Sequence, residues 1–354
     1  MDTSEVRVGV IGFGLAGSAF HAPLIDVTPG LEVSAIVTRD VERRAQAKRD
    51  YPSVTLLDTA EALFANKQID IVVIATPNST HVPFAQAALQ AGKHVAIDKP
   101  AAPTSADMER LIKLAQQHKR ILTIYQNRRW DGDFLTVKQL IQQGLLGDVF
   151  SYESHFDRYR ATANRDAWRE RASEAGGLLY DLGAHLIDQA LQLFGPAERV
   201  YAEVERRRPG VTVDDVAFVN LTHKNGVRSR LYATVLARIL GPRFHVRGML
   251  GAYEKYGLDP QEDALRAGHL PVSPTWGTEP RSAWGHLSTT AGGLHIDGPV
   301  ETLPGCYQCF YELLRDAITL GGPPPVDPAD AVASLRVIEA AFQSSETGEV
   351  VRLG

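Results

Sequence analysis

The sequence predicts an α/β protein of two domains, the first built on a doubly wound parallel sheet and the second on a large, open, mostly antiparallel sheet. Its 354 residues are enough for two hydrophobic cores. In the first third, apolar β-branched runs alternate with helical patterns, which is typical of parallel sheets. Later segments of alternating polarity, with hairpin signals, indicate antiparallel strands. We therefore expect domains at residues 1–125 and 126–354.

The first domain is expected to alternate strands with helices. Gly92 is placed to end one helix, and Thr104 or Ser105 to cap another. In such a fold, ligands bind at the carboxyl ends of the strands. The expected strands are Val6–Ile11, Leu31–Val37, Ile69–Ala75, His94–Ile97 and Ile121–Tyr125, and the expected helices are Ser18–Asp26, Val41–Arg49, Thr59–Ala65, Val82–Ala91 and Ala106–His118.

A glycine motif follows the first strand directly. Gly12, Gly14 and Gly17 have the GxGxxG spacing, between a strand pattern and a helical pattern. The first glycine permits a tight turn, the second lets a pyrophosphate approach the backbone, and the third lets helix and strand pack closely. The free N–H groups that begin the helix face the anion. The alternative is a bare strand–helix turn, but the context indicates a Rossmann-type dinucleotide site that includes Phe13 and Leu15.

Composition excludes several classes of protein. A hydrophobic fraction of 44% and a charged fraction of 22% are those of an ordinary soluble globular protein. A formal net charge of -5 provides no basic field for nucleic acid or an anionic membrane. There is no charged-then-apolar leader and no apolar run of membrane-spanning length, so we expect a cytoplasmic protein. The two cysteines, Cys306 and Cys309, form a CxxC pair but are expected to be ordinary thiols.

The end of the second strand bears on the choice of nicotinamide cofactor. About 20 residues beyond the glycines, a carboxylate would bind a ribose 2′-hydroxyl and an arginine a 2′-phosphate. Arg39 offers a guanidinium suited to phosphate, and Thr38 offers a hydroxyl. Asp40 either binds the 2′-hydroxyl or caps the helix that follows. We expect NADP to be preferred, with NAD as the alternative.

Polar residues also follow the strand that ends at Ala75. Pro77 stops that strand, and Asn78 or Ser79 can cap the next helix. Backbone donors of this loop, which begins at Thr76, are then left near the cofactor. His81 either touches the ligand or occupies the first turn of the helix.

The turn Asp98-Lys99-Pro100 follows the strand that ends at Ile97. A lysine at the carboxyl edge of the sheet, beside the expected nicotinamide, is unusual for a structural residue. A solvated surface lysine is the alternative. Pro100 has no N–H for a strand ladder and is suited to a fixed turn and to a cis bond. We therefore predict that Lys99 takes part in the chemistry.

The second domain is expected to contain long strands with a few helices on one side of the sheet. The sequence Lys224-Asn225-Gly226 is a hairpin signal, residues 271–305 form a Pro- and Gly-rich excursion, and residues 321–325 connect two helices. The expected strands are Val149–Tyr159, Arg199–Arg207, Val216–Thr222, Val227–Leu236 and Arg243–Tyr256, and the expected helices include Asp133–Gln143 and Ala329–Ser345.

One pair of residues in the second domain points to proton transfer. Asp181 and His185 are four positions apart on an expected helix that follows two glycines, so both side chains project from one face. A histidine can take the proton of an alcohol, and a neighbouring carboxylate can orient it and support its charged form. Taken alone, such a pair is better interpreted as a helix cap and a core histidine. The glycines and Lys99 favour the catalytic interpretation.

The chain resembles the glucose–fructose oxidoreductase/inositol dehydrogenase family, Gfo/Idh/MocA, over essentially its whole length. Five motifs carry the resemblance: the glycine loop, ATPNSTH at 75–81, Asp98-Lys99-Pro100 in place of Glu-Lys-Pro, Trp168-Arg169, and Asp181-x-x-x-His185. Longer matches at 20–24, 127–136, 180–189 and 255–268 are similar to the scyllo-inositol dehydrogenase branch. These long matches are far more specific than the glycine loop.

The resemblance implies reversible oxidation of a secondary hydroxyl of a cyclitol or sugar by a nicotinamide cofactor. By position, Lys99, Asp181 and His185 match the catalytic set of the family. His185 would accept the hydroxyl proton, Asp181 would orient it or hold an adjacent hydroxyl, and Lys99 would stabilise negative charge on the oxygen. Further candidates for the cofactor are Asp98, Asn127, and the pair Trp168 and Arg169, which matches a pair near the cofactor and substrate pocket. Candidates for the other substrate hydroxyls are Asn127, Arg128, Asp157, Tyr159 and Arg160, each of which could equally be a surface or structural polar residue.

Other functions stay open at this point. A non-catalytic, cofactor-sensing regulator on the same fold can dispense with Lys99 and His185, so their joint presence favours an enzyme. Glycosidase-like chemistry through transient oxidation would give product without a net change in NADPH. No third ligand accompanies His185 and Asp188 at a useful spacing, so no metal is expected. We expect a homodimer or homotetramer that acts on a small polyol or sugar, without nucleic-acid or membrane partners.

Overall fold

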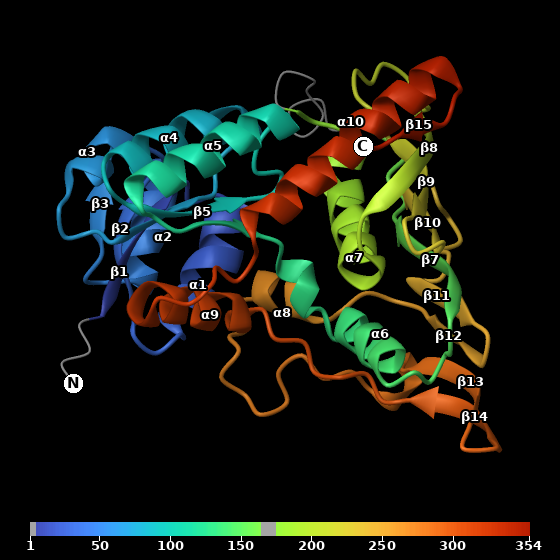
Figure 1. The fold of residues 1–354 in the computed structure, drawn as a ribbon. Coiled ribbons are helices and arrows are strands. Elements are labelled where there is room, and N and C mark those ends of the chain that lie inside the picture. The colour runs from blue at the N-terminus through green and yellow to red at the C-terminus, as the bar shows by residue number, and fades with distance from the viewer. Residues whose placement is uncertain (1–4, 164–174) are drawn as a thin grey trace. The chain divides into compact units, whose positions relative to one another are not determined.

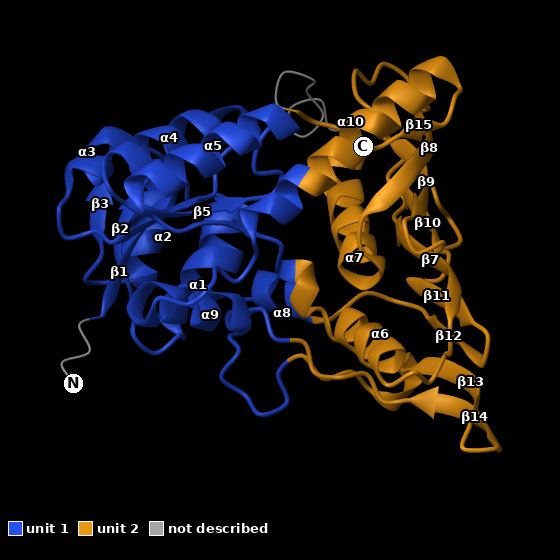
Figure 2. Ribbon diagram, viewed as in Figure 1, with its two compact units in different colours: residues 1–127, 261–276, 306–332 blue, residues 128–260, 277–305, 333–354 orange. Residues whose placement is uncertain are grey.

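The computed structural model describes residues 5–163 and 175–354, which form two compact units (Figure 2). The first unit holds the chain up to Asn127 together with 261–276 and 306–332. The second holds 128–260, 277–305 and 333–354. Along the chain, the first passage from one unit to the other is at 127/128. Segments 261–276 and 306–332 also belong to the first unit, and no periodic pattern in the sequence predicts this.

A six-stranded, wholly parallel sheet in the order β3-β2-β1-β4-β5-β6 is the centre of the first unit. Strands β1 and β4 are buried on both faces, which explains their unbroken Val and Ile runs. The strand order reverses between them, which is where a doubly wound sheet binds its ligand. The strands are β1 (Val6–Ile11), β2 (Leu31–Val37), β3 (Thr55–Leu57), β4 (Ile71–Ile74), β5 (His94–Asp98) and β6 (Leu122–Tyr125).

Helices cover this sheet, with α4 and α5 on one face and α1 and α9 on the other (Figure 1). Asp40, Thr59 and Thr104 cap α2, α3 and α5 by accepting backbone N–H groups. Gly92, with a φ of +75°, ends α4 as predicted. The helices are η1 (Ala16–His21), α1 (Ala22–Asp26), α2 (Val41–Asp50), α3 (Ala60–Ala65), η2 (Asn78–Thr80), α4 (His81–Gln90), α5 (Ser105–His118), α8 (Gln261–Arg266) and α9 (Gln308–Leu320).

The second unit is built on a nine-stranded sheet in the order β14-β13-β12-β11-β7-β10-β9-β8-β15. Only the β7–β10 pair is parallel, so the predicted mostly antiparallel sheet is confirmed. Buried and less buried residues alternate along β9 and β10, as one covered face requires. The strands are β7 (Val149–Asp157), β8 (Ala197–Glu205), β9 (Val216–His223), β10 (Arg228–Thr234), β11 (Phe244–Gly248), β12 (Gly251–Lys255), β13 (Gly285–Ala291), β14 (Leu294–Val300) and β15 (Val351–Arg352).

Helices α6 and α7 lie on one side of this sheet (Figure 1). Helix α7 is buried along most of its length and packs on β7 and β10. Helix α10 begins in the first unit and continues in the second. The remaining helices are η3 (Asn127–Trp130), α6 (Gly132–Gln142), η6 (Leu179–Gly183), α7 (Ala184–Phe194), η7 (Arg281–Ala283) and α10 (Pro328–Thr347).

Two parts of the second sheet differ from the sequence expectation. The stretch 243–256 is a hairpin of β11 and β12 rather than one strand. Its turn residues Met249 and Leu250 are apolar yet 73% and 50% exposed, so polarity gave no turn signal. The excursion at 271–305 contains the β13–β14 hairpin. Because β14 is exposed along most of its length, it lacks the buried alternation by which strands are recognised.

The cysteine expectation is corrected as well. Cys306 and Cys309 are joined by a disulfide at the start of α9 rather than standing as ordinary thiols. Their Cα atoms lie 5.5 Å apart, because one helical turn brings positions three apart within bridging distance. Within residues 5–163 and 175–354, no helix is long and apolar enough to cross a membrane.

Candidate active site

Two glycines of the loop, Gly12 and Gly17, have no room for a side chain. A Cβ on Gly17 would overlap the carbonyl oxygen of Gly12, and one on Gly12, whose φ is +93°, would overlap the carbonyl oxygen of Ala75. At Gly14 an added Cβ would meet only the Arg43 guanidinium, at 3.8 Å. Space therefore lies over Gly14, where a pyrophosphate approaches the backbone. The residues of this loop fit a dinucleotide.

The two apolar residues of the loop have different environments. Phe13 is buried and packs edge-on against Tyr51, with ring centroids 6.4 Å apart. Leu15 is exposed at the start of η1. Phe13 thus belongs to the core, while Leu15 is the side chain that solvent or a ligand can reach.

Two arginines follow β2, and one of them, Arg43, lies beside the glycine loop. Asp40 accepts the N–H of Arg43 at 2.9 Å and so caps α2, one of its two predicted roles. The Nε of Arg39 donates to the Asp58 carbonyl at 3.1 Å, and its other nitrogens make no hydrogen bond within the described chain. Thr38 is buried. Arg43 was not predicted, although a cation in the first turn of a helix is unfavourable and indicates an anion nearby.

His81 joins two of the predicted loops. Its buried ring places Nδ1 2.8 Å from the Pro100 carbonyl oxygen and Nε2 2.9 Å from that of Thr76. Burial lowers the pKa of His81, against the opposing charge of Asp98 and the two carbonyls. His81 therefore holds the loop after β4 against the turn after β5. The other predicted residues of the first loop flank η2: Pro77 precedes it and the buried Asn78 begins it.

Lys99 follows β5 at the carboxyl edge of the sheet, and its bond to Pro100 is cis. Asp98 accepts the Lys99 backbone N–H at 2.8 Å through Oδ1, and its Oδ2 lies 3.7 Å from His21 Nε2. His21 Nδ1 lies 2.6 Å from the Tyr311 hydroxyl. Burial opposes ionisation of Asp98, but the nearby His21 ring and the charge of Lys99 outweigh it and lower the pKa of Asp98. Asp98 is thus an ionised anchor for the backbone of Lys99.

In the second unit, Asp181 lies in η6 and the buried His185 in the first turn of α7. Asp214 anchors the start of these helices, because its Oδ2 accepts the Leu179 N–H at 2.7 Å. A Cβ on Gly177, whose φ is +109°, would overlap the Asp214 carboxylate. Burial raises the pKa of Asp214 to about 6, although backbone hydrogen bonds oppose the shift. Asp214 was not predicted as a site residue, and its only signal in the sequence is the acidic pair at 214–215.

The His185 ring packs beside the ring of Phe156, which makes cation–π contacts with two arginines. Its centroid lies 6.3 Å from that of Phe156 on β7. The guanidinium carbons of Arg128 and Arg243 lie 4.8 and 4.3 Å from the Phe156 centroid. Such cation–π contacts hold the ring in place. The Phe156 ring is therefore held in a fixed position beside His185.

The next residues of α7 are held by charge-assisted hydrogen bonds. Arg129 donates from Nε and Nη2 to the two carboxylate oxygens of Asp188, at 2.8 and 2.6 Å. Gln189 donates to the Arg128 carbonyl at 2.8 Å, and its Oε1 accepts Arg243 Nη2 at 2.8 Å. A bidentate pair and a bridging amide restrict both translation and rotation of a helix. They fix α7 relative to the segment 128–131 and to the start of β11.

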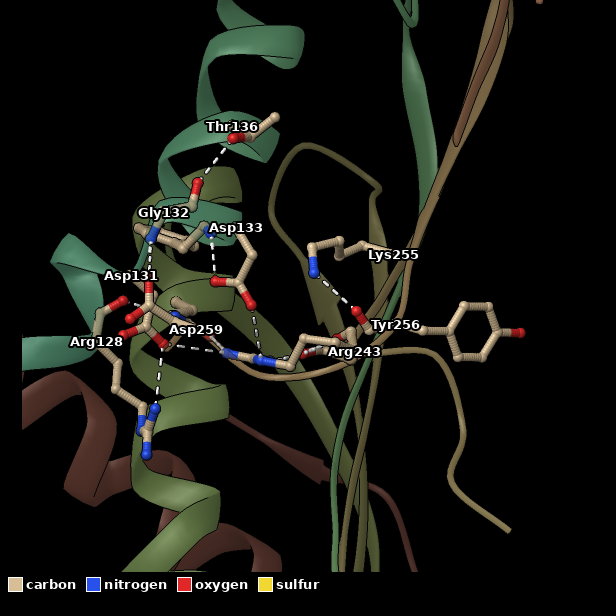
Figure 3. Close-up of polar contacts among 12 residues, drawn as sticks. Arg128, Asp131, Gly132, Asp133, Thr136, Arg243, Lys255, Tyr256 and Asp259 are labelled. Atoms are coloured by element: carbon tan, nitrogen blue, oxygen red, sulfur yellow. Dashed lines mark hydrogen bonds and ion pairs between the residues drawn. The ribbon is translucent and has the colours of Figure 1, made fainter. Parts of the chain in front are cut away.

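Figure 3 shows the buried charges that complete this arrangement. Arg128 Nη1 lies 3.3 Å from Asp131 Oδ2, and Arg243 lies 3.6 Å from Asp133 and 3.9 Å from Asp131. Burial raises the pKa of Asp131 despite Arg128, and the charges of Asp259 and Asp133 add to the shift. Arg128, predicted to bind substrate, is itself buried within this cluster.

The other predicted substrate residues lie around the end of β7. Asp157 lies 3.2 Å from His155 Nδ1 on one face of the strand, whereas Phe156 occupies the other face, so Asp157 is not brought to His185. The Tyr159 hydroxyl accepts Arg238 Nη2 at 2.6 Å. Among the remaining predicted residues, Arg160 is exposed, Asn127 begins η3, and Trp168 and Arg169 lie outside the described residues.

Comparison with known protein families decides the identity of the fold. Residues 6–126 match the family model described as an oxidoreductase family, NAD-binding Rossmann fold, and residues 138–353 match its C-terminal alpha/beta domain. The chain belongs to the Gfo/Idh/MocA oxidoreductase family. This Gfo/Idh/MocA member is therefore an enzyme with an NAD-binding Rossmann domain, and the predicted fold class is confirmed.

Similar Gfo/Idh/MocA proteins extend over the whole chain. The uncharacterized oxidoreductase YdgJ of Escherichia coli (strain K12) is 40% identical over 97% of each chain. The scyllo-inositol 2-dehydrogenase (NADP(+)) IolW of Bacillus subtilis (strain 168) is 37% identical over 98% of this chain and 96% of its own. The solved structure of yvaA from Bacillus subtilis is 35% identical, covers 100% of both chains and has a TM-score of 0.95.

Proposed function

We propose that this protein is an NADP-dependent dehydrogenase that oxidises a secondary hydroxyl of a cyclitol or sugar of the scyllo-inositol type. The observation that carries the proposal is the anchoring of Lys99 at the carboxyl edge of β5 by the ionised Asp98. Ligands of doubly wound sheets bind at this edge. The full-length similarity to a relative named scyllo-inositol 2-dehydrogenase (NADP(+)) supports the substrate class.

Each residue of the proposed set has a chemical role. A bound nicotinamide supplies the acceptor for the electron pair of the carbinol C–H bond. His185 accepts the hydroxyl proton, and Asp181 supports the resulting charge or holds an adjacent hydroxyl. The Lys99 ammonium stabilises negative charge that develops on the oxygen. The buried surroundings of His185 exclude water from the proton acceptor.

Two arginines support the preference for NADP. Arg39 lies in the loop after β2, and no described residue forms a hydrogen bond with its terminal nitrogens. Arg43 lies beside Gly14. Asp40, the carboxylate that would favour NAD, is occupied as the cap of α2. We expect Arg39→Ala to raise the KM for NADP at least about tenfold, because one charge-assisted phosphate contact is lost, with little effect on NAD.

The test is a cofactor-absorbance assay of a panel of inositols and aldoses with NADP and NAD in parallel. We expect turnover with one or more polyols. Replacing the catalytic groups, by Lys99→Met and His185→Asn, should lower kcat by about 10²–10⁴-fold while cofactor binding persists. The exposed residues of α5 provide matched controls, Lys113→Met and His118→Asn, which should behave as wild type.

The outcomes separate the alternatives. Cofactor binding without turnover on any polyol would favour a regulatory protein, and product formation without net NADPH would indicate transient oxidation. Near-normal rates in both catalytic variants would refute the assignment. We also propose that the protein is a cytoplasmic homodimer or homotetramer. Sedimentation of the purified chain tests the oligomeric state.

A further inference from the structure

The disulfide lies at the amino end of α9, within the first unit. Cys306 and Cys309 are the only two cysteines of the chain. Cys306 precedes α9, Cys309 lies in its first turn, and the N–H of Cys309 donates to the Cys306 carbonyl at 3.1 Å. The positive end of the helix dipole stabilises a thiolate at this end of a helix. The location therefore favours the reactive form of either sulfur once the bridge is open.

The bridge contributes little to the fold. It links positions three apart, so it closes a very short loop and removes little entropy from the unfolded chain. Helix α9 is already held by the buried side chains of Phe310, Tyr311 and Leu314. Both cysteine residues are half-buried rather than enclosed. A role in stability does not explain the pair.

Metal binding does not explain the pair either. A structural zinc site needs about four ligands from cysteine, histidine or carboxylate. Among residues 5–163 and 175–354, no group of three or more His, Cys, Asp or Glu side chains is placed to hold a metal ion.

We propose that Cys306 and Cys309 form a reversible thiol–disulfide exchange site whose reaction partners are dithiols and disulfides. A thiolate of a dithiol reductant attacks one sulfur of the bridge, forms a mixed disulfide and releases the other cysteine as a thiolate. The second thiol of the reductant then displaces the first cysteine and closes its own disulfide. Two electrons and two protons pass to the cysteine pair, and the reverse reaction consumes a disulfide oxidant.

Contacts lead from this bridge to the turn that carries Lys99. Tyr311 lies two residues beyond Cys309, and its hydroxyl is 2.6 Å from His21. His21 in turn faces Asp98 at 3.7 Å, and Asp98 holds the Lys99 backbone. The Tyr311 ring also packs 6.0 Å from the ring of Tyr125 at the end of β6.

A second set of contacts precedes the helix. The Tyr307 N–H donates to Gln261 Oε1 at 2.8 Å, and the same oxygen accepts Trp276 Nε1 at 3.0 Å. Opening the bridge releases the backbone between Cys306 and Cys309, next to Tyr311, from one constraint. We therefore expect turnover to differ between the oxidised and reduced protein, a consequence that rests on the proposed function.

The exchange site is tested on the purified full-length chain without any enzyme assay. The protein is equilibrated in mixtures of reduced and oxidised dithiothreitol, quenched with acid, alkylated, and weighed by mass spectrometry. We expect the number of alkyl tags on the two cysteines to change reversibly between none in the oxidised protein and two in the reduced protein. The circular dichroism spectrum should stay unchanged under these conditions. Cys306→Ser and Cys309→Ser each leave one thiol, and incubation with oxidised glutathione should give a mixed disulfide at one of them faster than at the other.

Two results would overturn the proposal. In the first, both cysteines are alkylated at every ratio of reduced to oxidised dithiothreitol, so that no bridge forms. In the second, the bridge is reduced only in denaturant. The coupling to Lys99 is measured separately, as kcat/KM of the oxidised and reduced enzyme, with Cys306→Ser/Cys309→Ser as the redox-insensitive control. An effect of about fivefold or more is expected for coupled sites. Tag counts do not depend on turnover, so failure of the proposed enzymatic function would leave them unaffected.

Discussion

Replacing Arg243 by leucine is expected to destabilise the second unit strongly. Arg243 is 2% exposed, and its guanidinium donates to Ser154 at 2.6 Å and to Gln189 at 2.8 Å. The guanidinium carbon lies 4.1 Å from the Phe244 ring centroid. Leucine leaves the buried Asp133 without this cation. Removing one partner of a buried ion pair costs about 3–5 kcal/mol. With about 2–4 °C per kcal/mol for a unit of this size, the apparent Tm should fall by roughly 6–20 °C.

Calorimetry and urea unfolding of wild type and variants measure this loss. Arg199→Leu is the matched control, since that arginine is exposed on the same sheet and meets Glu198 only at 4.0 Å. Asp133→Asn keeps the acceptor for the Phe134 N–H and removes the charge, so Arg243→Leu/Asp133→Asn should recover part of the loss. An Arg243→Leu variant within about 0.5 kcal/mol of wild type, as surface substitutions are, would refute the reasoning.

Two further predictions concern the anchors of the site. Gly17→Ala should unfold the nucleotide loop, because its Cβ overlaps the Gly12 carbonyl, whereas Gly14→Ala should fold and only weaken NADPH binding; equal Tm values for the two would contradict this. Asp214 retains its proton to about pH 6 in the fold, so wild type loses stability as pH rises from about 4 to 6, by about 2–3 kcal/mol. Asp214→Asn should abolish that loss in pH-dependent unfolding, and an unchanged pH profile would refute it.

Local patterns were sufficient to predict most of the fold. The parallel strands were recognisable because central strands bury both faces and so consist of unbroken Val and Ile. The hairpin after β9 was recognisable because Gly226 takes a φ of +88°, which Asn-Gly sequences favour. The helix caps were equally local, since Asp40 and Thr104 bond within three residues.

The supports of the candidate site could not be predicted in this way. Arg243 contacts Ser154 and Gln189, which are 89 and 54 residues distant in the chain. Without those partners, a lone arginine beside a strand would indicate a surface position. Asp214 is 35 residues from the Leu179 N–H that it accepts. Because a buried charge depends on partners that only the fold assembles, no periodicity in the sequence reveals it.

The interleaved path of the chain restricts how this protein can be divided. A fragment that stops at Asn127 carries the whole parallel sheet but lacks α9. It would expose Tyr125, whose ring packs 5.0 Å from Phe310, and would leave the buried His21 without its tyrosine partner. Residues up to 127 therefore cannot be moved into another protein as a complete folding unit. A chimaera built with a foreign substrate half must carry segments 261–276 and 306–332 along with residues 5–127.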